Sequence, residues 1–208
     1  RRAAIAALRS LSALAHDEAT RIATDLRLGL MLETHAMDPA TERDAMTASS
    51  REALERLREA LTLDPLSVTA ATSLARVANR LGDASGAAAA AISLAELSVQ
   101  PKVRAKYLVD AANLLLSDST EEALGPMDER AERAAQLLEK ALDSDPNSTT
   151  AATRLSQVRS RQGRSERLID VFRSAIVRAT ARDAIVYIGT EIARVARDDL
   201  GDVSVAIE

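Results

Sequence analysis

The sequence predicts an all-α fold, and three observations carry that prediction. Ala and Leu, which both favour helices, supply most of the apolar content of a 208-residue chain that is 47% hydrophobic. Only seven Gly and five Pro interrupt the chain, too few for a sheet protein with many tight turns. One pattern also occurs twice: ALERLREALTLDP at 53–65 and AAQLLEKALDSDP at 134–146 share Ala, Leu, Ala-Leu and Pro at the same spacing.

Helical spacing begins in the opening residues of the chain. Apolar residues recur there at three-residue intervals: Ile5, Leu8, Leu11 and Leu14. A secretory leader is the weaker interpretation of this stretch, because Arg9 interrupts its apolar run. The first helix of a hairpin is then expected at 19–33.

A longer polar connection is expected at 34–48, before the second helix of that hairpin. Ser49 and Glu52 have the spacing of a capping box and would begin this helix. The helix is expected to end before Pro65, because proline cannot continue a helix and holds Asp64, the residue before it, in extended geometry.

The next hairpin is the clearest one in the sequence. Residues 66–82 carry one apolar stripe and end at Gly82, a residue suited to a left-handed helix cap. The Ala-rich segment 84–97 is the expected second helix, and Pro101 begins the following unit.

The second half of the chain is expected to repeat this organisation. A helix at 107–116, a polar connection at 117–130 and a helix that ends before Pro146 form one hairpin. The next hairpin has its first helix between Pro146 and Gly163, the same distance as between Pro65 and Gly82. A further first helix is expected at 183–202, and the final residues look like the opening of another helix.

These landmarks resemble the tetratricopeptide repeat, a helical hairpin of about 34 residues with small residues at the crossing points and a closing proline. The second helix of that motif is matched by two sets: Ala53, Leu57, Ala60 and Pro65, and Ala134, Leu138, Ala141 and Pro146. The Leu-Gly pair of its first helix corresponds to Leu28-Gly29, Leu74-Ala75, Leu155-Ser156 and Ile188-Gly189. The chain departs from the motif at Ala71 and Ala152, where the family has an aromatic residue, and in the two longer connections.

The resemblance implies a right-handed superhelical α-solenoid of antiparallel helix pairs, with about 11 helices in a single array over residues 1–208. The expected units are 17–65, 66–100, 101–146, 147–181 and a partial unit at 182–208. Both ends of the sequence are expected to cut through a longer, bacterial protein, which would leave apolar helix faces available for self-association.

The resemblance also implies a concave groove lined by the first helices, which binds a peptide or a protein. By their position, seven polar residues would face it: Thr72, Arg76, Asn79, Arg80, Thr153, Gln157 and Arg161. Guanidinium and amide groups in such a groove can hold carboxylates or the backbone of an extended peptide, so the expected partner is acidic.

Charge is distributed unevenly along the second half of the chain. Residues 117–145 carry a net charge of −6 and residues 147–182 carry +6, although the whole chain has −4. The basic segment is interpreted either as the ordinary solvated face of a charged helical array or as part of a binding groove. Nucleic acid is not an expected partner, because the net charge is negative and only three aromatic residues are present to stack on bases.

No chemistry-bearing motif accompanies the repeats. The two histidines, His16 and His35, do not form a metal-ligand pattern, and no phosphate-binding loop or nucleophile motif occurs. The absence of cysteine excludes disulfides and thiolate zinc sites, and no apolar run is long enough to span a membrane. We therefore expect no catalytic residues, no metal and no cofactor in this chain.

The leading functional hypothesis is a non-catalytic protein–protein interaction scaffold. The alternative is a structural spacer or self-assembly element of a larger protein, in which any catalytic or signalling domain lies outside this sequence. The sequence indicates no compartment.

Overall fold

The computed structural model describes residues 1–117 and 126–201, and all regular structure in this part of the chain is helical. Its ten helices are α1 (Arg2–Leu14), α2 (Glu18–Ala36), α3 (Arg43–Leu63), α4 (Val68–Leu81), α5 (Ala84–Leu97), α6 (Pro101–Leu115), α7 (Met127–Ser144), α8 (Thr149–Arg161), α9 (Ser165–Arg178) and α10 (Arg182–Asp198). The all-α prediction is therefore confirmed. The chain divides into two compact units, Arg1–Leu97 and Ser98–Glu208, which we describe one at a time.

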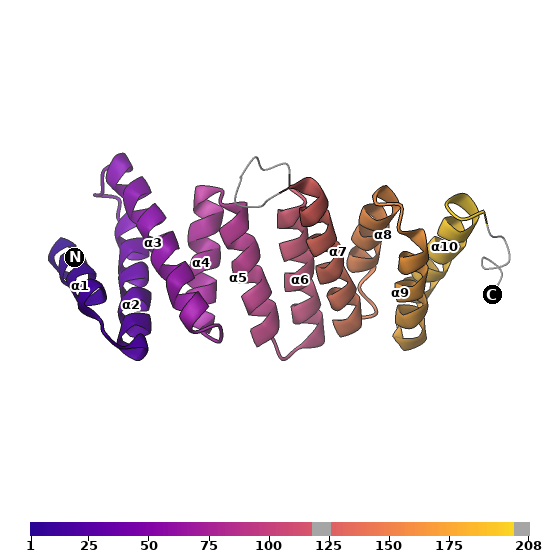
Figure 1. Cartoon of the computed structure of the whole chain (residues 1–208), viewed down its shortest axis with the longest axis horizontal. Helices are drawn as coiled ribbons and strands as arrows, with labels where there is room; N and C mark the ends of the chain where they lie inside the picture. The colour runs from indigo at the N-terminus through magenta and orange to yellow at the C-terminus, as the bar shows by residue number, and fades with distance from the viewer. Residues whose placement is uncertain (118–125, 202–208) are drawn as a thin grey trace. The chain divides into compact units, whose positions relative to one another are not determined.

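The first unit contains two hairpins, α2 with α3 and α4 with α5, and α1 packs on α2 (Figure 1). Helix α4 contacts both helices of the preceding hairpin. Four fully buried leucines lie in this core: Leu28, Leu32, Leu57 and Leu74. Burial of each contributes on the order of 2 kcal/mol, so apolar packing holds these helices together.

The second unit is built in the same way from α6 to α10 (Figure 1). Helices α6 and α7 form one hairpin and α8 and α9 the next, while α10 packs on both α8 and α9. In addition, α8 contacts α6, and α9 contacts α7, so each hairpin lies against the equivalent helices of the one before it. The core includes Leu138, Leu155, Phe172 and Ile188, none of which is exposed.

The sequence repeat has a direct structural counterpart in the turn after each second helix. Asp64 and Asp145 adopt extended backbone angles, with φ of −127° and −135°, as the following proline requires. Their side chains accept hydrogen bonds from the amides two residues further on. Ser67 and Ser148 then cap α4 and α8 by accepting from the third amide after them. In both turns, the four residues from Asp to Ser (64–67 and 145–148) therefore end one helix and begin the next.

Glycine ends the first helix of each of these hairpins. Gly82 and Gly163 have φ of 70° and 66°, in the left-handed region that residues with a side chain seldom adopt. The expected cap at Gly82 is confirmed, and Gly163 has the same backbone conformation.

Small residues lie at the helix crossings, as the sequence predicts. Ala53, Ala60, Ala134 and Ala141 have at most 1% of their surface exposed. Gly29 lies even closer to its neighbour, because a Cβ atom there would be 2.8 Å from Cγ of Leu57. That distance is too short for two carbon atoms, so α2 and α3 pack at this separation only with glycine at position 29.

The expected connection at 34–48 is wrong. Helix α2 continues to Ala36 and α3 begins at Arg43, so the extra residues lengthen both helices and leave only a short turn. Ser49 lies inside α3 and caps nothing; its hydroxyl is 3.4 Å from Nδ1 of His35. Charged and alanine residues can extend a helix beyond its apolar stripe, so the stripe alone does not mark where the helix ends.

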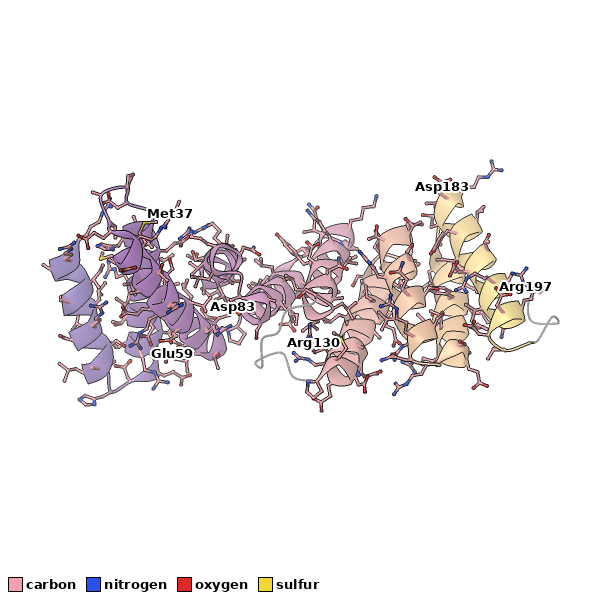
Figure 2. All side chains as sticks on the ribbon, turned by 90° about the horizontal axis from the view of Figure 1, so that it is seen from above. Met37, Glu59, Asp83, Arg130, Asp183 and Arg197 are labelled. Carbon is pink, nitrogen blue, oxygen red and sulfur yellow. The ribbon has the colours of Figure 1, made fainter. Side chains whose placement is uncertain are left out.

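The connection predicted at 117–130 ends earlier than expected in the part of the chain that the structure describes. Helix α7 begins at Met127, within the predicted 117–130 segment, and residues 118–125 lie outside the described part. Arg130 lies at the start of α7 (Figure 2). It is buried, and its guanidinium donates to the carbonyl oxygens of Leu115 and Ser117 at the end of α6. The expected eleventh helix falls at 202–208, also outside the described residues.

Candidate functional site: the polar faces of α4 and α8

The seven predicted groove residues lie on two helices, one in each unit. Helix α4 carries Thr72, Arg76, Asn79 and Arg80, and helix α8 carries Thr153, Gln157 and Arg161. The intervals of four, seven and eight residues place each set on one face of its helix. The structure therefore supplies two candidate faces, one per unit.

Arg76 is already engaged within the first unit. Its Nε and Nη2 atoms donate to the two carboxylate oxygens of Glu33 on α2, at 2.8 and 3.1 Å, and Nη2 also reaches the hydroxyl of Ser73. The Glu33 side chain is only 6% exposed, so the arginine neutralises a nearly buried charge. Arg76 thus joins the first helices of two successive hairpins, a role that sequence spacing did not reveal.

Asn79 and Arg80 are the open part of the α4 face. Both side chains are exposed, and neither makes a hydrogen bond or an ion pair with any residue that the structure describes. The Thr72 hydroxyl donates to the backbone carbonyl of Val68 and is half-buried. Asn79 and Arg80 therefore keep their full hydrogen-bonding capacity for a ligand.

The α8 face repeats this arrangement. The Thr153 hydroxyl donates to the carbonyl of Thr149, as Thr72 does to Val68. Gln157 is exposed and accepts a hydrogen bond from Arg154 at 3.2 Å. Arg161 is exposed and has no partner among the described residues, so it matches Arg80 at the equivalent position.

The charged segments of the second half pair with each other. Arg159 is 2% exposed and binds Glu132 and Glu139 of α7, each through a nitrogen–oxygen contact of 2.6 Å. The other three pairs join the same two segments: Arg164 with Glu132, Arg167 with Glu139, and Arg178 with Asp143. At least four of the eight arginines in the basic segment thus neutralise the acidic segment before it, whereas Arg161 has no partner among the described residues.

These contacts change the ionisation of the glutamates. The hydrogen bond from Arg159 lowers the pKa of Glu132 below its ordinary value. Burial opposes ionisation of Glu139, but hydrogen bonds from Arg167 and Arg159 outweigh it, so the pKa of Glu139 is also lowered. Both carboxylates are therefore charged at neutral pH, and the network is an ion-pair cluster.

A polar pocket of about 630 Å³ lies beside this network at the start of α9. Gln136, Arg164 and Ser165 are among the residues that line it. Its arginines already pair with Glu132 and Glu139, so the pocket offers little excess charge to a ligand.

A second polar contact, between α8 and α10, was not predicted either. The Ser156 hydroxyl donates to Glu191 at 2.5 Å, and Arg194 bonds both of these residues. Burial opposes ionisation of Glu191, but the bonds from Arg194 and Ser156 lower its pKa. First helices of successive hairpins are thus joined by partly buried polar contacts in both units.

Neither histidine contributes to a metal cluster. Among the described residues, no group of three or more His, Asp or Glu side chains is placed to hold a metal ion. None of the described helices combines the length and the apolar character that a membrane span requires. No protein-family model matches this sequence, and no curated protein sequence matches it significantly.

Proposed function

We propose that this chain is a non-catalytic protein-interaction scaffold in which the α4 face and the α8 face each bind an extended acidic peptide or protein segment. One observation carries the proposal: Arg80 and Arg161 occupy equivalent positions of two hairpins, are exposed, and have no internal partner among the described residues. Arg76 and Arg159, by contrast, already form ion pairs within their own units.

We further propose that the helices form a tetratricopeptide-like solenoid within each unit. Contacts between successive first helices support this, because α2 touches α4, and α8 touches both α6 and α10. Such stacking aligns the exposed faces of the first helices, so a bound peptide would meet several of them in succession.

The chemistry suits a carboxylate ligand. A guanidinium group presents parallel donors that match the two oxygens of a carboxylate, and neighbouring amides such as Asn79 and Gln157 bond a peptide backbone. The contact is exposed to solvent, so each arginine contributes modestly, and affinity comes from several such contacts along the peptide.

The test is a selection of random peptides displayed on phage, with the whole chain as bait, followed by fluorescence anisotropy. We expect acidic peptides to be enriched, and the double variant Arg80→Glu/Arg161→Glu to weaken their binding by about tenfold or more. The matched control is Arg51→Glu/Arg133→Glu, which reverses one exposed charge on the second helix of a hairpin in each unit and should bind as the wild type does.

Arg76 is left out of this test for a structural reason. Reversing its charge would place a second carboxylate beside the nearly buried Glu33 and would destabilise the first unit. Failure to enrich any peptide, or equal binding by the two double variants, would exclude the binding faces. Concentration-dependent oligomers in light scattering would then favour the alternative, a self-assembly element.

A further inference from the structure

Helix α1 is held to the first unit by few apolar contacts. Only Ile5 of this helix is buried, while Leu11 and Leu14 are 54% and 66% exposed. It lies at the edge of its unit against α2 (Figure 1). Segments with so little buried apolar surface open at a small cost in free energy.

Polar contacts also attach this segment to its unit. Three carboxylates face this segment from α2, from the turn after α2 and from α3: Asp25, Asp38 and Glu52. Arg1 pairs with Asp38 at 2.7 Å, and Arg9 pairs with both oxygens of Glu52. We call these three carboxylates the α1 seat. The negative charge of the α1 seat complements the positive charge of a basic helix.

Asp25 is the member of the α1 seat that α1 satisfies poorly. Its side chain is 1% exposed, and Oδ1 accepts a hydrogen bond of 2.6 Å from the hydroxyl of Ser12. Oδ2 is buried without a partner, and so is Nε of Arg56, whose Nη1 lies 3.5 Å from Oδ1. A buried carboxylate oxygen without a donor destabilises the fold, because it has lost its water without gaining a hydrogen bond. A serine offers one donor, whereas a guanidinium offers two in the geometry that a carboxylate accepts.

We propose that the α1 seat binds a basic amphipathic helix of a partner protein that carries arginine where α1 has Ser12, and that α1 is displaced when this helix binds. The three carboxylates select a basic helix, and the unpaired Oδ2 of Asp25 selects an arginine at that one position. This surface is separate from the α4 face, so the inference does not depend on the proposed peptide-binding function.

The seat preference is tested first within the intact chain. Ser12→Arg adds the second donor at Asp25, whereas Ser10→Arg adds the same charge to an exposed position of the same helix. We expect hydrogen–deuterium exchange of the α1 amides to be about tenfold slower in Ser12→Arg than in Ser10→Arg. When Asp25→Asn is added to both variants, this difference in exchange rate should vanish. Equal exchange in the two arginine variants would show that Arg56 already satisfies Asp25, and the proposal would fall.

Displacement is tested with synthetic peptides of residues 1–14 added to the wild-type chain at up to about 1 mM, because tethered α1 competes at about that effective concentration. The Ser12→Arg peptide should bind about tenfold more tightly than the Ser10→Arg peptide, and should accelerate exchange of the α1 amides at saturation. Equal affinities, or binding that leaves α1 protected, would overturn the proposal.

Discussion

At the scale of single residues, arginine has two distinct roles in this chain. Some arginines, such as Arg159 and Arg76, neutralise carboxylates that lie inside the protein. Others, such as Arg80 and Arg161, lie exposed without a described partner. Only the second group lacks an ion pair within the described residues, so an excess of arginine in a sequence segment is not by itself evidence of a binding site.

The buried Arg159 gives the first prediction. Arg159→Met removes the cation that joins Glu132 to Glu139, and should lower the free energy of unfolding by about 3 kcal/mol, since one partner of a buried ion pair is lost. The control Arg154→Met, on the exposed side of the same helix, should change it by less than about 0.5 kcal/mol. Urea denaturation followed by circular dichroism measures both. Similar losses of unfolding free energy in the two variants would mean that the buried ion pairs of Arg159 add no stability beyond that of an exposed arginine.

The lowered pKa of Glu139 gives a prediction on acid stability. A carboxylate with a lowered pKa in the folded state stabilises the fold above its unfolded pKa, and this contribution is lost as the pH falls through the folded value. The wild type should therefore be more stable than Glu139→Gln at pH 7. The difference should shrink as the pH falls below the ordinary glutamate pKa of about 4.3 and vanish below the lowered folded pKa. Thermal unfolding at a series of pH values measures the stability of both proteins. A stability difference between wild type and Glu139→Gln that stayed constant from pH 7 into the acid range would contradict the lowered pKa of Glu139.

The ion pairs were not predictable from sequence for a simple reason. Arg159 and Glu132 are 27 residues apart and lie on different helices, so their contact depends on how α8 packs against α7. The opposite charges of the two segments were visible in the sequence, but their mutual pairing was not. The same applies to Arg76 and Glu33, which are 43 residues apart.

At the scale of helices, prediction succeeded where turn chemistry and periodicity agreed. The helix 84–97 was predicted with the bounds that α5 has, because Gly82 and the Pro101 that follows delimit it. Prediction failed at 34–48, where no apolar stripe marks the extra turns of α2 and α3. Landmarks such as proline and glycine thus locate helix ends better than composition does.

Gly29 and Gly189 follow the corresponding Leu or Ile of two first helices, and we expect their replacement by alanine to change stability in opposite directions. Gly29→Ala would place Cβ 2.8 Å from Cγ of the fully buried Leu57, and should destabilise the chain by about 1–3 kcal/mol. Gly189→Ala meets its nearest neighbour, Cδ1 of Ile176, at an ordinary 3.6 Å, and should stabilise α10 by about 0.5–1 kcal/mol. Thermal unfolding of the two variants checks this. An unchanged or raised stability of Gly29→Ala would contradict the packing of α2 against α3, and a lowered stability of Gly189→Ala would contradict the open space at Gly189.

At the scale of the whole molecule, the chain is divided into two compact units, Arg1–Leu97 and Ser98–Glu208. In a repeat array each hairpin depends mainly on its immediate neighbours. Gly29→Ala should therefore accelerate hydrogen exchange in α2 and α3 and leave exchange in α8 and α9 unchanged. Equal acceleration in both units would show that they unfold as one.

The whole molecule also sets what the sequence alone could establish about function. The sequence predicted polar faces on α4 and α8, but it could not distinguish Arg76, which pairs with Glu33, from Arg80, which has no partner among the described residues. That distinction depends on Glu33, which lies on another helix. The proposed function therefore rests on fewer residues than the predicted set, mainly Asn79, Arg80, Gln157 and Arg161.

The most direct test of the account is a hydrogen-exchange footprint of the whole chain with a selected acidic peptide bound. Protection should appear in α4, in α8 or in both, because their exposed faces carry the open polar side chains, and it should be absent when Arg80→Glu/Arg161→Glu replaces the wild type. Protection confined to the second helices α3, α7 and α9, or a footprint that survives the double charge reversal, would contradict it.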